Sequence, residues 1–156
     1  MMNADAAPRD FRPRDYPVGP LGRGLLVLIG LALAAGFGLA WTVSPDSRGY
    51  GTHQQFGLPP CSLYVLFGIP CPSCGSTTAF AHYVRGEWLA AARSNMAAFL
   101  LALLCTLLIP WSGYSAWRGR LWRISDPAWS IALALVGLAP TSLLHWGVRC
   151  VAARMT

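Results

Sequence analysis

The residues best suited to chemistry lie in one short segment around two cysteines. Cys71 and Cys74 are three positions apart, Pro72 lies between them, and Gly75 follows directly. Two thiolates at this spacing can bind one metal ion, and a glycine after the second lets the backbone turn so that amide groups point at sulfur. Zinc ribbons use such turns in pairs, whereas this sequence contains a single one. A four-ligand site would therefore need ligands from elsewhere in the chain or from a second chain.

Several residues could complete such a site. Cys61 begins a short apolar segment before the motif, which we expect to bring its thiol toward Cys71 and Cys74. Candidates for a fourth ligand are His53, His145 and Cys150. Thiolate and imidazole groups favour a transition metal, and zinc is the cofactor that we expect.

Two other interpretations of the cysteines remain open. Cys-x-x-Cys pairs interconvert between dithiol and disulfide, and a helix N-terminus favours the thiolate, so Cys71 and Cys74 could form a redox site. No thioredoxin-like alternation of strands and helices surrounds them, however. A structural disulfide between Cys61 and Cys71 or Cys74 is the third interpretation. The chain has five cysteines, an odd number, so they cannot all pair within one chain.

The residues after Cys74 predict a helix from about residue 73 to 85, which Gly86 ends. In such a helix, Cys74 shares one face with three further polar residues. His82 is a poor partner for Cys74 on one metal ion, because eight residues of helix separate them by about 12 Å. The residues expected to support the motif are Pro72, Gly75, Thr77, Thr78, His82 and Arg85.

The composition predicts that lipid surrounds most of the chain. Hydrophobic residues make up 54% of the 156 residues and charged residues 12%, about half the charged fraction of soluble domains. The basic residues are all arginines, and the net charge is +6. They occur in short groups between apolar runs, as in loops that flank membrane spans, so we expect no nucleic-acid partner.

Apolar runs predict an all-α integral membrane protein with about three spans and short interfacial helices around the Cys-Pro-x-Cys-Gly motif. Residues 1–24 are polar and rich in proline, which predicts a disordered tail before a single helical membrane domain over residues 25–156. The predicted spans and the motif region are residues 25–43, 87–109, 127–148 and 61–86.

Some residues of these runs allow more than one interpretation. Residues 38–40 (Gly-Leu-Ala) resemble a small-residue cleavage site, so the first run could instead be a signal peptide. Gly30, at the start of a stripe of small residues in that run, would let another helix approach closely. Arg93 and Asn95 are polar groups in the second predicted span, where such groups usually face protein or water. Cys105, deep in the same span, is expected to be a small apolar filler.

The distribution of arginines predicts the orientation in the membrane. Four arginines precede the first predicted span and three follow the second, so seven lie on one side, against five on the other. The positive-inside rule therefore predicts a cytoplasmic N-terminus in an inner-membrane protein, with the cysteine motif outside. Three spans then place the C-terminus and Cys150 on the same side as Cys71 and Cys74.

The motif as a whole resembles a known family. Residues 68–80 (GIPCPSCGSTTAF), followed by Arg85-Gly86, Ala91-Ala92 and Asn95, are similar to small bacterial membrane proteins catalogued as domain of unknown function 2752. The resemblance covers roughly residues 61–108. It implies a helical membrane protein with its cysteines at one end of a span, and no established reaction.

Individual positions carry over from this resemblance. It implies that Cys61, Cys71 and Cys74 are the functional positions, with Gly75, Thr77 and Arg85 beside them. Members of the family often carry arginine where this chain has Thr78, and proline where it has Met96.

The sequence predicts a non-enzymatic role. It contains no phosphate-binding loop, no nucleophile elbow and no pair of carboxylates. We expect an accessory or scaffold protein whose cysteines bind a metal at the membrane surface. Its expected partners are the lipid bilayer and either other membrane proteins or further copies of itself. A membrane thiol–disulfide oxidoreductase that uses Cys71 and Cys74 is the alternative.

Overall fold

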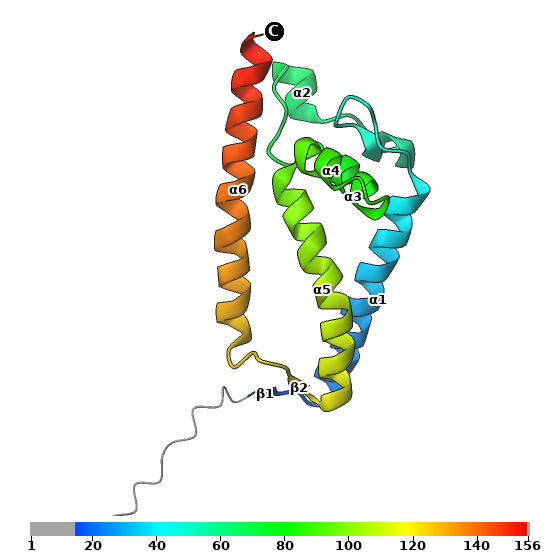
Figure 1. Ribbon diagram of the computed structural model, residues 1–156, viewed down its shortest axis with the longest axis vertical. Helices are drawn as coiled ribbons and strands as arrows, with labels where there is room; N and C mark the ends of the chain where they lie inside the picture. Colours follow the sequence, from blue (N-terminus) through cyan, green and yellow to red (C-terminus); the bar gives the residue numbers. More distant parts are fainter. Residues whose placement is uncertain (1–14, 156) are drawn as a thin grey trace, which may run out of the picture.

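Three long helices make up most of the protein. The computed structural model describes residues 15–155, and its long helices are α1 (Pro20–Thr42), α5 (Met96–Arg118) and α6 (Pro127–Met155). Each has a stretch long and apolar enough to cross a membrane, which in α6 is Pro127–Ala152. They lie lengthwise with α5 between the other two (Figure 1). The predicted all-α membrane architecture is confirmed.

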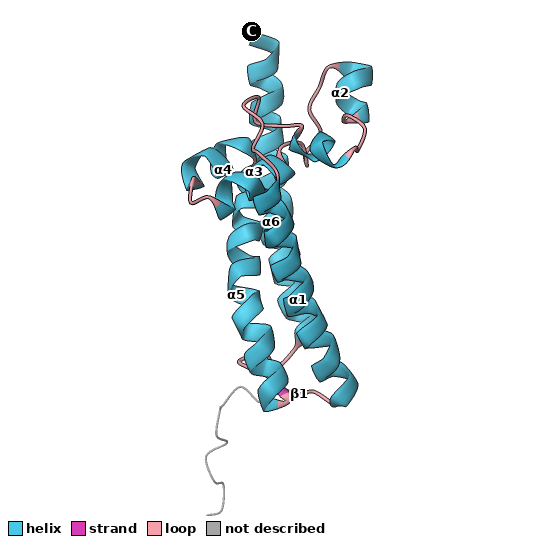
Figure 2. Cartoon of the chain, turned by 90° about the vertical axis from the view of Figure 1, so that its right-hand side faces the viewer, coloured by secondary structure: helices cyan, strands magenta, loops and turns pink. Residues whose placement is uncertain are grey.

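Short elements gather at the two ends of these helices. At one end lie the 3₁₀ helix η1 (Thr52–Phe56) and the helices α2 (Ser62–Phe67), α3 (Ser76–Val84) and α4 (Trp88–Ser94). At the other end, β1 (Tyr16–Pro17) pairs antiparallel with β2 (Arg120–Leu121). Both views place the cysteine-bearing segments at the end opposite this ladder (Figures 1 and 2).

Small side chains let the helices approach closely. A Cβ atom at Gly30 of α1 would lie 2.6 Å from the Ser112 hydroxyl of α5, so a larger residue here would have to displace that hydroxyl. Ala79, Ala91 and Ala98 form a second tight cluster where α3, α4 and α5 meet. Between membrane helices, close packing of small residues replaces the hydrophobic driving force that lipid does not supply.

Arginines hold both ends of α1. At its C-terminal end, the Arg85 guanidinium of α3 donates to the carbonyls of Trp41 and Val43 at 2.9 and 2.7 Å. At its N-terminal end, Arg23 donates to the carbonyls of Ala116 and Trp117 in the last turn of α5 at 2.7 and 3.0 Å. These carbonyls lie in the last turn of a helix or just after it, where the helix supplies no amide donor, so the arginines satisfy them while joining neighbouring segments.

The second predicted span, residues 87–109, is wrong in its boundaries. The segment is two helices, because Asn95 has an extended backbone (φ −161°, ψ 109°) between α4 and α5. Its side-chain oxygen accepts from the Ala98 amide at 3.0 Å, which makes it the N-cap of α5. The helix then continues through Pro110 to Arg118, beyond the predicted end at residue 109.

Two other boundaries also differ from the predictions. The predicted tail, residues 1–24, falls partly outside the described residues, but its part from Asp15 onward is structured, with β1 and the first turn of α1. Pro20 at the first helical position starts that helix, since its fixed φ suits a position that needs no amide donor. The third span continues as helix to Met155, beyond the predicted end at residue 148.

Candidate functional site

Three cysteines meet at the end of the protein opposite the β ladder. The Sγ atoms of Cys61, Cys71 and Cys74 all lie within 4.8 Å of one another, and those of Cys71 and Cys74 are 3.2 Å apart. In a tetrahedral site with Zn–S bonds of about 2.3 Å, sulfurs lie about 3.8 Å apart. The three sulfurs are therefore close enough together to reach one ion, with the Cys71–Cys74 pair closer than the tetrahedral spacing.

A glycine turn shapes the backbone that carries two of these sulfurs. Gly75 has a left-handed backbone (φ 88°) and is the N-cap of α3. A Cβ at this position would lie 2.6 Å from the carbonyl oxygens of both Gly49 and Ser94. The predicted helix from residue 73 is therefore wrong at its start, because Gly75 turns the chain and Cys74 precedes α3. Cys74 consequently shares no helix face with Thr78, His82 and Arg85.

Side chains from two distant helices hold the carbonyl groups of this turn. The Asn95 amide donates to the carbonyls of Pro72 and Cys74 at 3.1 and 3.2 Å. Arg149 of α6 donates to the Cys74 carbonyl at 2.8 Å. Trp146, on the same helix, donates to the Pro70 carbonyl at 2.6 Å. The cysteine turn is thus held by side chains that lie more than twenty positions away from it in the sequence.

The three thiols differ in their ease of ionisation. Burial raises the pKa of the Cys74 thiol to about 12, and its hydrogen bonds with Cys71 and Cys61 act in the same direction. Burial also raises the pKa of Cys61, but hydrogen bonds from the Tyr64 backbone and from the other two thiols outweigh it and lower this pKa to about 7. A first negative charge in the cluster therefore resides on Cys61, with the other thiols as donors to it. The expectation of a favoured thiolate at a helix start does not hold for Cys74.

The thiols line a cavity of about 590 Å³. Its walls include the tyrosine pair Tyr50 and Tyr64, whose hydroxyls are 3.0 Å apart, and Arg48, which is paired with Asp46 at 2.7 Å. That pairing, through hydrogen bonds from Arg48, lowers the pKa of Asp46 to about 2. The thiols are therefore accessible through this cavity, while Asn95 and Arg149 hold the turn that carries two of them.

The candidates for a fourth ligand lie apart from this group. His53 lines the cavity, but one of its ring nitrogens is hydrogen-bonded to the Pro59 carbonyl at 3.1 Å. His145 and Cys150 are on α6, and the His145 Nε2 is buried without a hydrogen-bond partner among the described residues. None of the three belongs to the group of mutually close ligand atoms.

The remaining predicted residues have structural positions around the site. Thr78 is fully buried, and its hydroxyl lies 2.8 Å from that of Thr52, which ties α3 to η1. Thr77 lines the cavity. His82 pairs with Glu87 across the turn between α3 and α4, and Arg85 caps α1 as described above. Pro72 contributes the carbonyl that Asn95 binds.

Sequence reasoning missed the residues of α6 that hold the turn. Arg149 and Trp146 lie about seventy positions after the motif, and nothing local to them indicated a contact with it. An arginine near the end of an apolar run is ordinarily explained by contact with headgroups. The role of Asn95 could have been recognised, since asparagine before a long apolar run is a strong N-cap signal.

Comparison with known proteins supports the resemblance given by the motif. Residues 61–109 match the model of a family described as "Protein of unknown function (DUF2752)", and this segment contains the three clustered cysteines. No curated protein and no solved structure matches the chain. The matched segment is thus similar to a domain whose function is unknown.

Proposed function

We propose that this protein binds a divalent transition metal, zinc in the first instance, through Cys61, Cys71 and Cys74. The observation that carries the proposal is the approach of three sulfurs to within 4.8 Å of one another. They come from two segments separated by α2, so their meeting is a property of the fold and not only of the short motif. Thiolate ligands favour zinc and other soft metals over magnesium or calcium.

The site's surroundings support a binding role. Asn95 and Arg149 fix the turn that carries Cys71 and Cys74, and such outer contacts orient metal ligands and strengthen binding. The proposed role is that of a non-enzymatic accessory or scaffold protein. Lipid would cover the apolar faces of α1, α5 and α6, and the metal centre would be presented at the membrane surface to another membrane protein or a second copy.

Metal analysis of the full-length protein in detergent tests this proposal. We expect about one zinc per chain after purification in zinc-containing buffer, and loss of that zinc in Cys74→Ser. Cys105→Ser is the matched control, because Cys105 is also a buried thiol but lies within α5, away from the cluster. His145→Gln and His53→Gln then test for a fourth ligand. Absence of stoichiometric metal from the folded wild-type protein would sink the proposal.

A thiol–disulfide function is the second candidate, favoured by two observations. The Cys71 and Cys74 sulfurs are only 3.2 Å apart, and the pKa of Cys61 is lowered to about 7. Oxidation of Cys71 and Cys74 would release two protons and pass two electrons to a thiol–disulfide partner, which would be reduced to its dithiol. A metal-free protein whose cysteines titrate at a cellular redox potential would favour this candidate. A disulfide that resists reduction would instead indicate a purely structural bond.

We also propose that the metal site faces the outside of the inner membrane. The arginines of the connection between α5 and α6 lie at the end opposite the thiols, in keeping with a cytoplasmic β ladder. A membrane-impermeant maleimide should therefore label Cys61 and Cys71 in intact cells, after metal has been removed with a chelator. Labelling that requires cell lysis would reverse the assigned orientation. Cys105→Ser removes any background from the span.

A further inference from the structure

The end of the protein opposite the thiols has an apolar pocket of about 490 Å³. Residues of α5 form one wall, and the connection from β2 to α6 forms the other. The side chains that define it are Leu107, Leu108, Trp111, Tyr114, Trp122 and Ile124. A volume of this size is typical of sites for small molecules or lipid chains.

Aromatic side chains join the two walls of this pocket. The Trp111 indole donates to the Trp122 carbonyl at 3.0 Å, which fixes the connection against α5. Tyr114 and Trp122 pack edge to face, with ring centroids 5.4 Å apart. Tryptophan and tyrosine favour the boundary between hydrocarbon and headgroups, so the pocket lies at the depth where a lipid changes from chain to headgroup.

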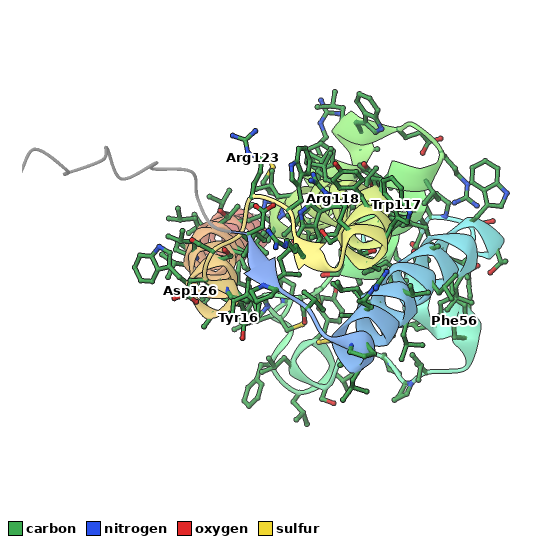
Figure 3. The ribbon with its side chains drawn as sticks, turned by 90° about the horizontal axis from the view of Figure 1, so that it is seen from below. Tyr16, Phe56, Trp117, Arg118, Arg123 and Asp126 are labelled. Atoms are coloured by element: carbon green, nitrogen blue, oxygen red, sulfur yellow. The ribbon has the colours of Figure 1, made fainter. Side chains whose placement is uncertain are left out.

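Arginines lie next to residues that line the pocket. The Arg118 guanidinium lies 5.5 Å from the Tyr114 ring centroid and donates to its hydroxyl at 2.9 Å. Arg120 and Arg123 are exposed on the connection that forms the second wall. Figure 3, a view from this end, shows Arg118 at the end of α5 and Arg123 on that connection.

The acidic groups nearby leave this border positively charged. Asp15 accepts a hydrogen bond from the Arg123 backbone amide at 3.0 Å, and the carboxylate of Asp126 accepts from the Trp129 amide at the start of α6. Both carboxylates are thus used as backbone acceptors. Among the described residues at this end of the protein, four arginines outnumber these two acids: Arg23, Arg118, Arg120 and Arg123.

We infer that this pocket binds one anionic phospholipid. An acyl chain would occupy the apolar space between α5 and the connection, and the phosphate would accept hydrogen bonds from Arg118 and Arg123. Arginine matches phosphate geometry with paired donors, and the ligand's apolar and anionic parts correspond to the two parts of the site. A lipid without net charge would gain less from the arginines, and free phosphate has no acyl chain for the apolar space. Both should therefore bind more weakly than an anionic phospholipid.

Native mass spectrometry of the full-length protein in detergent tests the inference. The probes are dioleoyl phosphatidylglycerol, the matching phosphatidylcholine and inorganic phosphate, each titrated separately. We expect one phosphatidylglycerol to be retained several-fold more tightly than phosphatidylcholine, and phosphate not at all. Arg118→Gln and Arg123→Gln should each weaken phosphatidylglycerol binding about fivefold, since an arginine near an anionic lipid contributes about 1 kcal/mol.

Matched controls separate a site from general attraction. Arg93→Gln removes the same charge at the thiol end, where Arg93 is exposed on α4, and should leave lipid retention unchanged. Leu108→Trp fills the pocket and should weaken both lipids, with folding checked by circular dichroism. Equal retention of the two lipids by wild type, or equal losses in Arg93→Gln and Arg118→Gln, would overturn the inference. So would undiminished retention in a folded Leu108→Trp variant. None of these outcomes depends on the thiol site.

Discussion

The two ends of the helical bundle are built in different ways. At the thiol end, buried polar side chains bind backbone carbonyls, and Gly75 packs directly against the carbonyls of two other segments. At the β-ladder end, Arg23 also binds two backbone carbonyls, but an apolar pocket lies beside α5 and the corresponding turn glycine, Gly119, has no neighbour of its Cβ position closer than 3.8 Å. The thiol end therefore has little freedom to adjust, as a preorganised site requires, whereas the other end can accommodate changes.

The largest expected difference between the ends comes from adding one methyl group. Gly75→Ala should destabilise the protein by about 3 kcal/mol or more, because left-handed strain adds to clashes with two rigid carbonyls. Gly119→Ala meets no clash and should cost only about 1 kcal/mol. Thermal unfolding in detergent measures both. Similar losses in the two variants would show that the thiol end is no more tightly packed than the other.

A smaller effect is expected from neutralising one arginine at each end. Arg149→Gln loses hydrogen bonds to the carbonyls of Cys74 and Ser94 and should lower stability by about 2 kcal/mol. Because it also releases the cysteine turn, zinc affinity should fall about tenfold, as for other outer contacts of metal ligands.

Arg23→Gln is the control for this prediction. It also removes hydrogen bonds to two carbonyls, but at the β-ladder end, so zinc affinity, measured by competition with a chelator, should stay at the wild-type value. An equal loss of affinity in both variants would mean that the effect is one of global stability and not of the turn.

The smallest change concerns reactivity alone, without a change of fold. With a pKa of about 7, Cys61 in the metal-free protein should gain about tenfold in alkylation rate between pH 6 and pH 8 and then level off. Cys74, with its pKa raised to about 12, should stay protonated and unreactive throughout. Peptide mass spectrometry after brief iodoacetamide treatment measures both rates.

The reference for this measurement is the protein in denaturant. In the unfolded chain, Cys61 and Cys74 should react at similar rates, and these rates should still rise above pH 8 as for ordinary thiols. Identical pH profiles in the folded and denatured protein would contradict the proposed hydrogen bonding of Cys61.

The three spans were predictable because lipid imposes a length and a composition on any helix that crosses it. Where the helices begin and end was less predictable. Hydropathy does not distinguish a polar turn inside a span from a break, so Asn95 was placed within one long helix. The second predicted span ends at residue 109, yet α5 continues through Pro110 to Arg118.

The candidate site was predictable only as far as its local chemistry. The spacing of Cys71 and Cys74, and the short apolar segment that begins at Cys61, identified the sulfurs that the fold brings together. The contacts of Arg149 and Trp146 with the turn depend on how α6 packs. No pattern in one sequence specifies such a long-range contact.

The position of α6 has a consequence for the order in which the protein is made. The three sulfurs belong to residues 61–74, whereas the side chains that lock their turn from α6 lie at residues 142–149. During synthesis the thiols leave the ribosome well before that helix exists. The turn that carries Cys71 and Cys74 therefore becomes fixed only when the last helix has been inserted beside it.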